Sequence, residues 1–367
     1  MKRIVAVLLC VVLLSACLFG CGKSGASTLK VEASYPRDYE GTVLNVYNWG
    51  QYISDGSEGS LNVNKEFEKL TGIKVNYAEY DSNESLYTKL KSGGAAYDII
   101  IPSDYMIARL IREGMLQKFD VTALSNYKYI ADEFKDLYFD PANEYSVPYQ
   151  FCYVGLIYNT KMVEGSPDSW GVMWDQKYAG NILNFNNSRD AFGVAQYYLG
   201  QDVNTNDKAD WDAAFAKLKE QKPLIQSYVM DEVFNKMEGG NAAIAPYYSG
   251  DFLTMHDVNP DLAFVYPKEG SNASVDSVCI PASAANVEAA KLYINFLLEP
   301  EVALANAEAI YYCSPHTAVT SNPDYSLRGN EVIYPPEEIT SKMQYFHNLD
   351  PETLAYINSL WNQLKIS

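Results

Sequence analysis

The sequence has little of what most catalytic and metal sites require. Only three histidines occur among 367 residues, His256, His316 and His347, and none lies in an H-E-x-x-H arrangement. Neither a G-x-S-x-G nucleophile elbow nor a phosphate-binding glycine loop is present. We therefore expect a binding protein without cofactor or metal rather than an enzyme.

Basic residues are also scarce. The chain has 28 Lys and Arg against 46 Asp and Glu, a formal net charge of −18. Nucleic acid and anionic membrane surfaces are poor partners for such a protein. A cationic ligand would be attracted to it, although an acidic balance also serves solubility and does not identify a ligand by itself.

Cysteines are few and unsystematically spaced. Three of the six lie in or beside the N-terminal apolar segment, and the others are Cys152, Cys279 and Cys313. The latter three show neither a zinc-binding spacing nor a disulfide framework. The expectation for each is a small buried hydrophobic side chain. The sequence leaves open whether one pair of them forms a disulfide.

The N-terminus has the pattern of an exported lipoprotein. Lys2 and Arg3 precede the apolar run 4–14, which is too short to span a bilayer as a mature helix. Leu14-Ser15-Ala16-Cys17 then matches a bacterial lipobox, with Cys21 as a poorer alternative lipidation site. We expect a signal peptide over 1–16, a flexible tether over 17–40, and lipid anchoring at the outer face of the cell membrane or in the periplasm. The alternative is an ordinary cleaved signal peptide with incidental cysteines.

After the tether, the pattern alternates strands with helices. It predicts a strand over 42–47, a helix ended by Gly72, a helix with a capping box of Asp81 and Glu84, a helical stretch over about 287–309, and a C-terminal helix from Pro351. Hydrophobic residues make up 48% of the chain, enough for sizeable cores. The alternation predicts two α/β lobes with largely parallel sheets and a cleft between them. Ligands of open α/β sheets bind beyond the carboxyl ends of strands. Several polar and aromatic groups have that position: 49–52, 103–105, 187–190 and 247–248.

The sequence resembles the spermidine/putrescine-binding proteins of polyamine ABC transporters over nearly its whole length. The collinear motifs that carry the resemblance are Tyr47-Asn48-Trp49-Gly50-Gln51-Tyr52, Tyr97-Asp98-Ile99-Ile100-Ile101-Pro102-Ser103, Tyr145-Ser146-Val147-Pro148-Tyr149, Tyr266-Pro267-Lys268-Glu269-Gly270 and Asp276-Ser277. The resemblance implies a type II periplasmic-binding-protein fold. It places lobe 1 at 41–150 and 276–322, and lobe 2 at 151–275 and 323–367.

The resemblance also implies a set of ligand-binding residues. Their expected chemistry is that of a polyamine site, where carboxylates neutralise ammonium groups and aromatic faces cover methylenes. Asp276 matches the essential aspartate of the family, and Asp190 matches a family glutamate on a shorter arm. The full expected set is Trp49, Gln51, Tyr52, Ser103, Tyr105, Asn187, Asp190, Tyr247, Tyr248, Asp276 and Tyr312.

Three positions depart from the family pattern. Asn187 stands where an aspartate is common, Ser274 where a tryptophan stacks on the ligand, and Phe346 near a family glutamine. Fewer carboxylates would favour putrescine, or a different amine, over spermidine, because a buried unpaired ammonium is costly. One of Tyr247 and Tyr248 is expected to replace a family tryptophan.

The expected partners are a small polyamine and the permease and ATPase subunits of an importer, with the protein itself a monomer. One alternative is a solute-binding lipoprotein for a sugar, iron or thiamine, which the abundance of tyrosine, 30 residues, keeps open. A less favoured alternative is a lipoprotein hydrolase.

Overall fold

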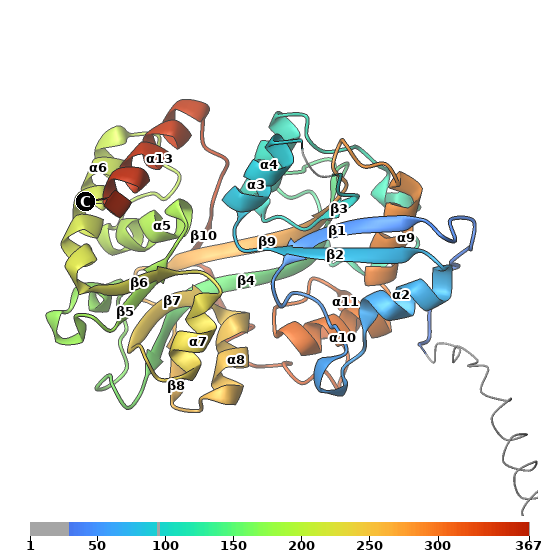
Figure 1. The fold of residues 1–367 in the computed structure, drawn as a ribbon. Helices are drawn as coiled ribbons and strands as arrows, with labels where there is room; N and C mark the ends of the chain where they lie inside the picture. The colour runs from blue at the N-terminus through green and yellow to red at the C-terminus, as the bar shows by residue number, and fades with distance from the viewer. Residues whose placement is uncertain (1–28, 94–95, 367) are drawn as a thin grey trace, which may run out of the picture.

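The computed structural model describes residues 29–93 and 96–366. Two α/β lobes lie side by side, and two long strands, β4 (Ser146–Asn159) and β9 (Ser271–Cys279), run from one lobe into the other (Figure 1). β4 and β9 are antiparallel neighbours over most of their length. They therefore contribute to the sheets of both lobes and to the floor between them.

Lobe 1 is built on the sheet β2-β1-β3-β9-β4. β1 (Val43–Trp49) is parallel to β2 (Lys74–Tyr80) and β3 (Ile99–Ile100). Helices cover both faces, so β1 is buried on both, with Leu44 and Val46 on one face and Tyr47 on the other. The helices of this lobe are α2 (Val63–Thr71), α3 (Asn83–Lys91), α4 (Asp104–Arg112), α9 (Val287–Leu297), α10 (Pro300–Ile310) and α11 (Thr317–Thr320).

Lobe 2 continues the sheet in the order β4-β7-β5-β6, with β8 paired to β4. Its core is a separate cluster that includes Trp170, Phe185 and Met255. The strands are β5 (Ile182–Phe185), β6 (Ile225–Val229), β7 (Ile244–Tyr248) and β8 (Leu262–Val265). The helices are α5 (Ser188–Leu199), α6 (Lys208–Gln221), α7 (Glu232–Glu238), α8 (Ser249–Val258) and α13 (Pro351–Ile366).

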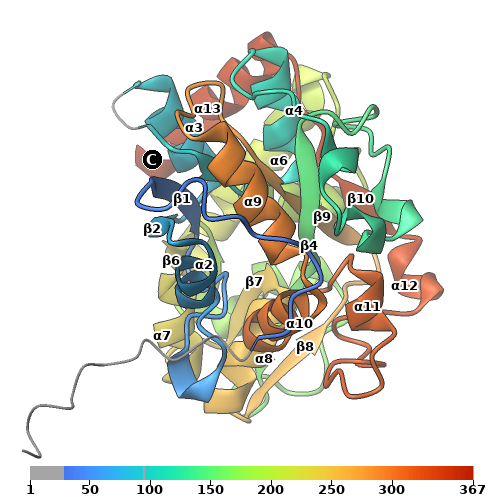
Figure 2. The same cartoon turned by 90° about the vertical axis from the view of Figure 1, so that its right-hand side faces the viewer.

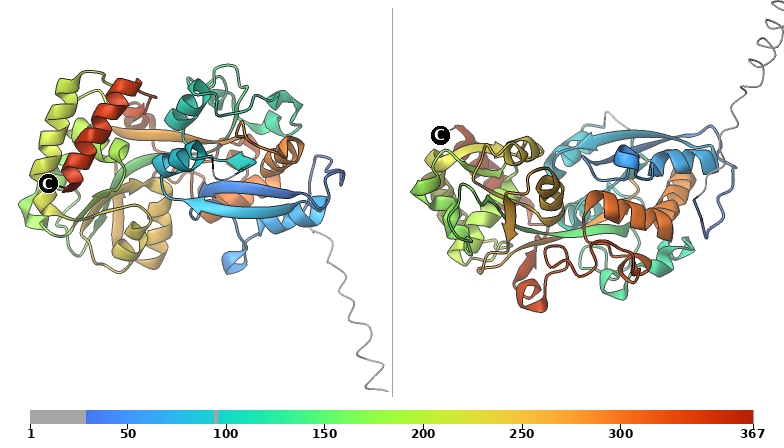
Figure 3. Two further views of the ribbon diagram at one scale, coloured as in Figure 1. Left: turned by 45° about the horizontal axis from the view of Figure 1, so that its top comes forward. Right: turned by 90° about the horizontal axis from the view of Figure 1, so that it is seen from below.

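The C-terminal segment returns to lobe 2 from lobe 1. The short helix α12 (Glu337–Thr340) leads into β10 (Met343–Tyr345), which pairs with β9 and so forms a third crossing. α13 then packs on α6 at the outer end of lobe 2 (Figure 3). The predicted helix beginning near Pro351 is present.

Local sequence explains where the first elements begin and end. The Asn62 side chain accepts a hydrogen bond from the Lys65 N–H and caps α2, and Gly72 ends that helix at φ 75°, a conformation in which glycine carries no Cβ penalty. The cap of α3 differs from the expected one. Ser82 and Ser85 form the capping box there, rather than Asp81 and Glu84.

Two expectations about the elements need correction. The sheets are mixed rather than largely parallel, because β9 is antiparallel to both β3 and β4. The helical stretch expected over 287–309 is two helices, since Pro300 cannot continue α9 and instead occupies the first turn of α10.

The segment expected to be a flexible tether, 17–40, is held against lobe 1 in its described part. The carboxylate of Glu299, itself fully buried, accepts hydrogen bonds from the backbone N–H groups of Glu32 and Ala33 and from the Tyr35 hydroxyl. The expected signal peptide and lipidation site lie outside the described residues.

The three described cysteines, Cys152, Cys279 and Cys313, are buried free thiols, and burial holds their pKa values well above the ordinary range. No helix within residues 29–93 and 96–366 is both long and apolar enough to cross a bilayer.

Candidate ligand-binding site

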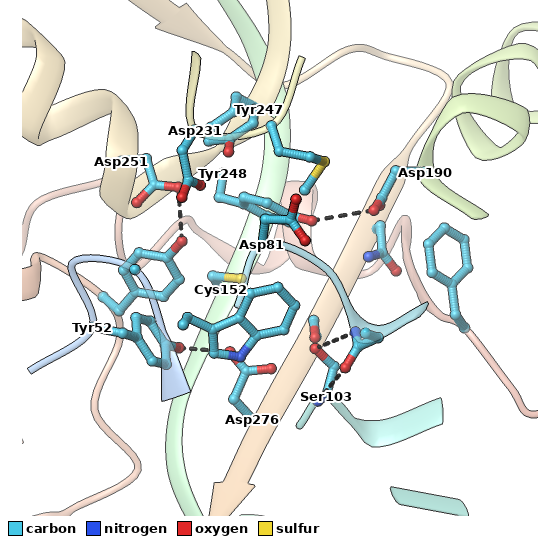
Figure 4. Close-up of a pocket in the computed structure, with 18 of the residues that line it drawn as sticks. Tyr52, Asp81, Ser103, Cys152, Asp190, Asp231, Tyr247, Tyr248, Asp251 and Asp276 are labelled. Carbon is cyan, nitrogen blue, oxygen red and sulfur yellow. Dashed lines mark hydrogen bonds between the residues drawn. The ribbon is translucent and has the colours of Figure 1, made fainter. Parts of the chain in front are cut away.

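A pocket of about 660 Å³, which includes its opening to solvent, lies between the two lobes. Lobe 1 contributes Trp49, Gly50, Tyr52, Asp81, Asn83, Ser103, Tyr105 and Tyr312. Lobe 2 contributes Asp190, Met230, Asp231, Phe234, Tyr247, Tyr248, Asp251 and Phe346. The crossing strands β4 and β9 form the floor with Cys152, Asn272, Ser274 and Asp276. Figure 4 shows Asp190, Asp251 and Asp276 approaching this space from three sides.

Asp276 lies in the middle of β9 at the pocket floor and is 5% exposed. Its Oδ2 accepts a 2.6 Å hydrogen bond from the Tyr52 hydroxyl. Its Oδ1 is buried and has no hydrogen-bond partner among the described residues. Burial raises the pKa of Asp276 to about 6, and the neighbouring hydroxyls of Ser103 and Tyr52 limit that rise. The structure thus records no hydrogen bond to this buried acceptor oxygen, while the Ser103 and Ser274 hydroxyls lie beside the carboxylate.

Aromatic rings surround this carboxylate on the lobe 1 side. Trp49 is fixed by an Nε1–H hydrogen bond of 2.8 Å to the Ile101 carbonyl, at the end of β3. Tyr52 contacts Tyr312 edge to face, with ring centroids 4.9 Å apart. Trp49 is the last residue of β1, and Tyr312 comes two residues after the end of α10, so the carboxyl ends of these two elements bring the rings to the cleft.

Asp190 projects from the first turn of α5 in lobe 2. Its Oδ2 accepts hydrogen bonds from the Asn187 amide at 2.7 Å and from the Tyr248 hydroxyl at 3.1 Å. Burial raises the pKa of Asp190 to about 6 despite these donors. Asn187 also caps α5 by accepting from the Asp190 N–H at 2.9 Å. Asn187 therefore orients Asp190 and does not itself line the pocket.

Three further carboxylates, Asp81, Asp231 and Asp251, line the pocket in addition to the expected Asp190 and Asp276. Asp251, in the first turn of α8, accepts a 3.0 Å hydrogen bond from Tyr312, and burial raises the pKa of Asp251 to about 7. Burial and, secondarily, the charge of Asp81 raise the pKa of Asp231 to about 6. Asp81 directly follows β2, and Asp231 and Asp251 come two and three residues after the ends of β6 and β7, so all three lie near the carboxyl ends of strands.

The structure brings together nine of the eleven expected residues in one pocket: Trp49, Tyr52, Ser103, Tyr105, Asp190, Tyr247, Tyr248, Asp276 and Tyr312. Gln51 and Asn187 do not line it. Gln51 is exposed, has φ 53°, and borders a different groove. Ser274 and Phe346, which differ from the family pattern, both line the pocket. Phe346 packs edge to face on Tyr105 and under the Arg189 guanidinium, 4.4 Å from its ring centre.

The two neighbouring tyrosines of β7 have different surroundings. The Tyr248 hydroxyl contacts Asp190, whereas the Tyr247 ring stacks on Phe185 at 5.5 Å and lies edge-on to Phe234 at 6.4 Å. Tyr247 is thereby part of the lobe 2 core as well as of the pocket wall.

The charge of the pocket is one-sided. Its described lining includes five aspartates and no Lys or Arg. Isolated carboxylates transferred from water to a protein interior are costly unless they are paired or protonated. A ligand that brings ammonium groups and an aliphatic surface would satisfy the carboxylates and cover the rings. Such an environment disfavours an anionic ligand by several like-charge contacts.

Comparison with known proteins identifies the class. The sequence profile of the bacterial extracellular solute-binding proteins matches residues 62–329. The chain belongs to this family of bacterial extracellular solute-binding proteins.

Individual relatives narrow the comparison. The spermidine/putrescine-binding periplasmic protein of Salmonella typhimurium is 32% identical over 335 residues, covering 91% of this chain and 94% of that protein. The putrescine-binding periplasmic protein SpuD of Pseudomonas aeruginosa is 30% identical, covering 88% and 92%. A crystal structure of the spermidine/putrescine ABC transporter substrate-binding protein PotD of Streptococcus pneumoniae, 34% identical, superposes with a TM-score of 0.73 over 89% of this chain and 99% of that one. The expected family and two-lobe fold are confirmed.

Proposed function

We propose that this chain captures a polyamine, spermidine or putrescine, in the interlobe pocket and delivers it to the permease of an ABC importer. The observation that carries the proposal is the buried Asp276 Oδ1, which accepts no hydrogen bond among the described residues, in a pocket whose described lining has no basic side chain. An ammonium group supplies a charged donor for this oxygen and the opposite charge together. The similarity to spermidine/putrescine-binding and putrescine-binding periplasmic proteins supports a polyamine as the source of that group.

The pocket residues have distinct roles in the proposal. Asp276 binds one ammonium through Oδ1, while Tyr52 holds its Oδ2. Asp190, oriented by Asn187 and Tyr248, binds a second ammonium. The rings of Trp49 and Tyr312 cover methylenes and attract the adjacent cations, at about 0.5–2 kcal/mol per contact.

The additional aspartates change the expected preference. The sequence favoured putrescine, or a different amine, because Asn187 replaces a carboxylate, but Asp81, Asp231 and Asp251 add three carboxylates to the described lining. A third ammonium therefore has a counter-charge available within the pocket. We propose that spermidine, with three ammonium groups, binds at least as tightly as putrescine.

The location, lipid anchor, oligomeric state and partners of the protein are proposed from the sequence pattern. We place the protein outside the cytoplasm as a monomer, anchored through a lipid on Cys17 or, alternatively, Cys21, and without enzymatic activity. The permease and ATPase of the importer are the proposed partners, and the lobe boundaries 41–150 with 276–322 and 151–275 with 323–367 stay a prediction.

Calorimetry of the soluble chain from residue 29 tests the proposal. Spermidine and putrescine should bind with micromolar or tighter Kd. Asp276→Asn should weaken binding at least about tenfold, because truncating one desolvated charge pair costs about 2–5 kcal/mol. Asp324→Asn removes the same charge from an exposed position and should bind like the wild type. Absence of heat with every polyamine, while a sugar or amino acid binds, would reject the polyamine assignment.

A further inference from the structure

Two consecutive tyrosines at the end of α10 reach from lobe 1 to the same helix of lobe 2. The Tyr312 hydroxyl donates to Asp251 Oδ2 at 3.0 Å, and the Tyr311 hydroxyl donates to Asp257 Oδ2 at 2.8 Å. Asp251 and Asp257 lie near the two ends of α8, whose apolar residues belong to the lobe 2 core. Figures 1 and 2 show α8 and α10 side by side at the boundary of the lobes. Both bonds therefore join the lobes.

The backbone at Tyr311 is unusual for a residue with a large side chain. Tyr311 ends α10 in the left-handed region, at φ 57° and ψ 18°. Glycine is the ordinary residue at such a helix end because it has no Cβ penalty there. A residue held in this region costs roughly 1–3 kcal/mol and persists where the surroundings enforce it. Tyrosine therefore occupies a position whose left-handed backbone favours glycine, which points to a role for the contacts of its side chain.

The neighbouring Tyr312 is closely fitted against lobe 2. A Cβ added at Gly250 would lie 2.1 Å from the Tyr312 Cδ2 atom, so the ring rests directly on the backbone of α8. Tyr312 is 6% exposed and forms part of the ligand pocket. The turn at Tyr311 determines the direction in which Tyr312 leaves α10.

Asp251 separates the ligand pocket from a second opening. It lines the pocket and also an interlobe groove of about 1460 Å³, open to solvent, in which Gln51, Asp257 and Tyr311 lie. The Tyr311–Asp257 bond crosses this groove on its outer side, while the Tyr312–Asp251 bond lies between groove and pocket. Loss of the outer bond would free the α10 end that carries Tyr312.

We propose that Tyr311 and Asp257 are positioning residues of the ligand site: their hydrogen bond outside the pocket holds Tyr312 on Gly250 and Asp251, and thereby closes the pocket toward the groove. The effect of this bond on ligand escape rests on the proposed polyamine function. The bond slows the escape of the ligand without touching it.

Dissociation kinetics of spermidine test the inference by stopped-flow fluorescence. Tyr311→Phe removes only the hydroxyl, and Tyr311→Gly removes the whole side chain while suiting the left-handed backbone. Each should raise the dissociation rate constant about fivefold, since interface contacts act mainly on dissociation. Asp257→Ala should do the same, and Tyr311→Phe combined with Asp257→Ala should exceed neither single variant, because one bond is lost in all three.

Two matched variants separate positioning from a general surface effect. Asp257→Asn keeps an acceptor oxygen for the Tyr311 hydroxyl, so its dissociation rate constant for spermidine should stay close to that of the wild type. Tyr356→Phe removes an equivalent hydroxyl–carboxylate bond to Asp212 within lobe 2 and should leave the rate unchanged. Dissociation rates of the Tyr311 variants equal to those of the wild type and Tyr356→Phe would overturn the inference.

Hydrogen exchange of the ligand-free protein decides the inference separately from the proposed function. The Cys313 N–H donates to the Phe151 carbonyl at 3.0 Å next to Tyr312, so its peptide reports on this segment. If the wild type binds no polyamine, the proposed function fails. Hydrogen exchange then decides by itself whether Tyr311 and Asp257 hold Tyr312 in place. Faster exchange of that peptide in Tyr311→Phe than in Tyr356→Phe then supports the inference, and equal exchange overturns it.

Discussion

The Tyr52 hydroxyl and the Asp276 carboxylate, 224 positions apart in the sequence, are joined by a 2.6 Å hydrogen bond at the floor of the interlobe pocket. The bond uses Oδ2 and leaves Oδ1 without a partner among the described residues. Tyr52 thus fixes the carboxylate in one orientation before a ligand arrives. Preorganisation of this kind lowers the cost of ordering the site on binding.

Removal of this bond tests the orienting role. Tyr52→Phe keeps the ring against Tyr312 but loses the hydroxyl, and should weaken spermidine binding about fivefold, in line with about 1 kcal/mol for one hydrogen bond. Calorimetry at pH 7.5 is the measurement. Tyr149→Phe is the matched control, because its hydroxyl donates to the Tyr52 carbonyl rather than to a carboxylate. An unchanged Kd in Tyr52→Phe would show that Asp276 needs no such support.

The affinity for polyamines should fall as the pH is lowered from 8 to 5. Burial raises the pKa of Asp276 and Asp190 to about 6 and that of Asp251 to about 7. Below these values the carboxyls are protonated and no longer neutralise ammonium groups, which stay charged throughout. At pH 5 the loss should be at least about tenfold at constant ionic strength. A flat profile would mean that these carboxylates do not bind the ligand.

The stability of the ligand-free protein should change with pH in the opposite direction. A carboxyl whose pKa is higher in the folded than in the unfolded state contributes stability below about pH 3.8, and that contribution is lost as the pH rises through 6 to 7. His316, buried with its pKa lowered to about 4, has the opposite effect between pH 4 and 6.5. It is one group against these three carboxyls and Asp231, whose pKa burial also raises to about 6.

Thermal unfolding measures this balance. The midpoint of the ligand-free chain should fall by several degrees between pH 5 and pH 7.5. Saturating spermidine should remove the fall, because the ammonium groups stabilise the ionised carboxylates and a bound ligand raises stability by mass action. A midpoint that rises over this range without ligand would contradict the assignment of unpaired carboxyls to the pocket.

The fit between Tyr312 and α8 can be tested at Gly250. Gly250→Ala places a methyl group where the Tyr312 ring lies, 2.1 Å from Cδ2, so the ring must move away from lobe 2. We expect weaker spermidine binding by about tenfold or more, with a stability loss of about 1–3 kcal/mol from overpacking. In a Tyr312→Ala background the same methyl group should cost less stability, because the ring that it displaces is absent there. Wild-type affinity in Gly250→Ala would place Tyr312 outside the ligand site.

Much of the fold could be predicted from local pattern. The strand over 42–47, the helix ended by Gly72 and the C-terminal helix all occur, because each depends on neighbouring residues. The break at Pro300 was missed although proline carries the information, since apolar residues continue on both sides of it. The antiparallel direction of β9 depends on the path of the chain between lobes, which periodicity does not contain.

The candidate site followed largely from the resemblance, and its exceptions have physical reasons. Gln51 lies between Trp49 and Tyr52 in sequence, but its positive φ turns it toward another groove. Asn187 lies beside Asp190 as a helix cap. Asp231 and Asp251 went unassigned because an acidic residue at the start of a helix is common on dipole grounds alone, and only the tertiary fold brings them to one cavity.

A crystal structure of the soluble chain grown with spermidine tests the central claim most directly. The account predicts an ammonium nitrogen at hydrogen-bond distance, about 2.7–3.2 Å, from Asp276 Oδ1, with the aliphatic chain against Trp49. A closed, polyamine-saturated protein in which Oδ1 contacts only protein or water, and the amine lies elsewhere, would contradict it.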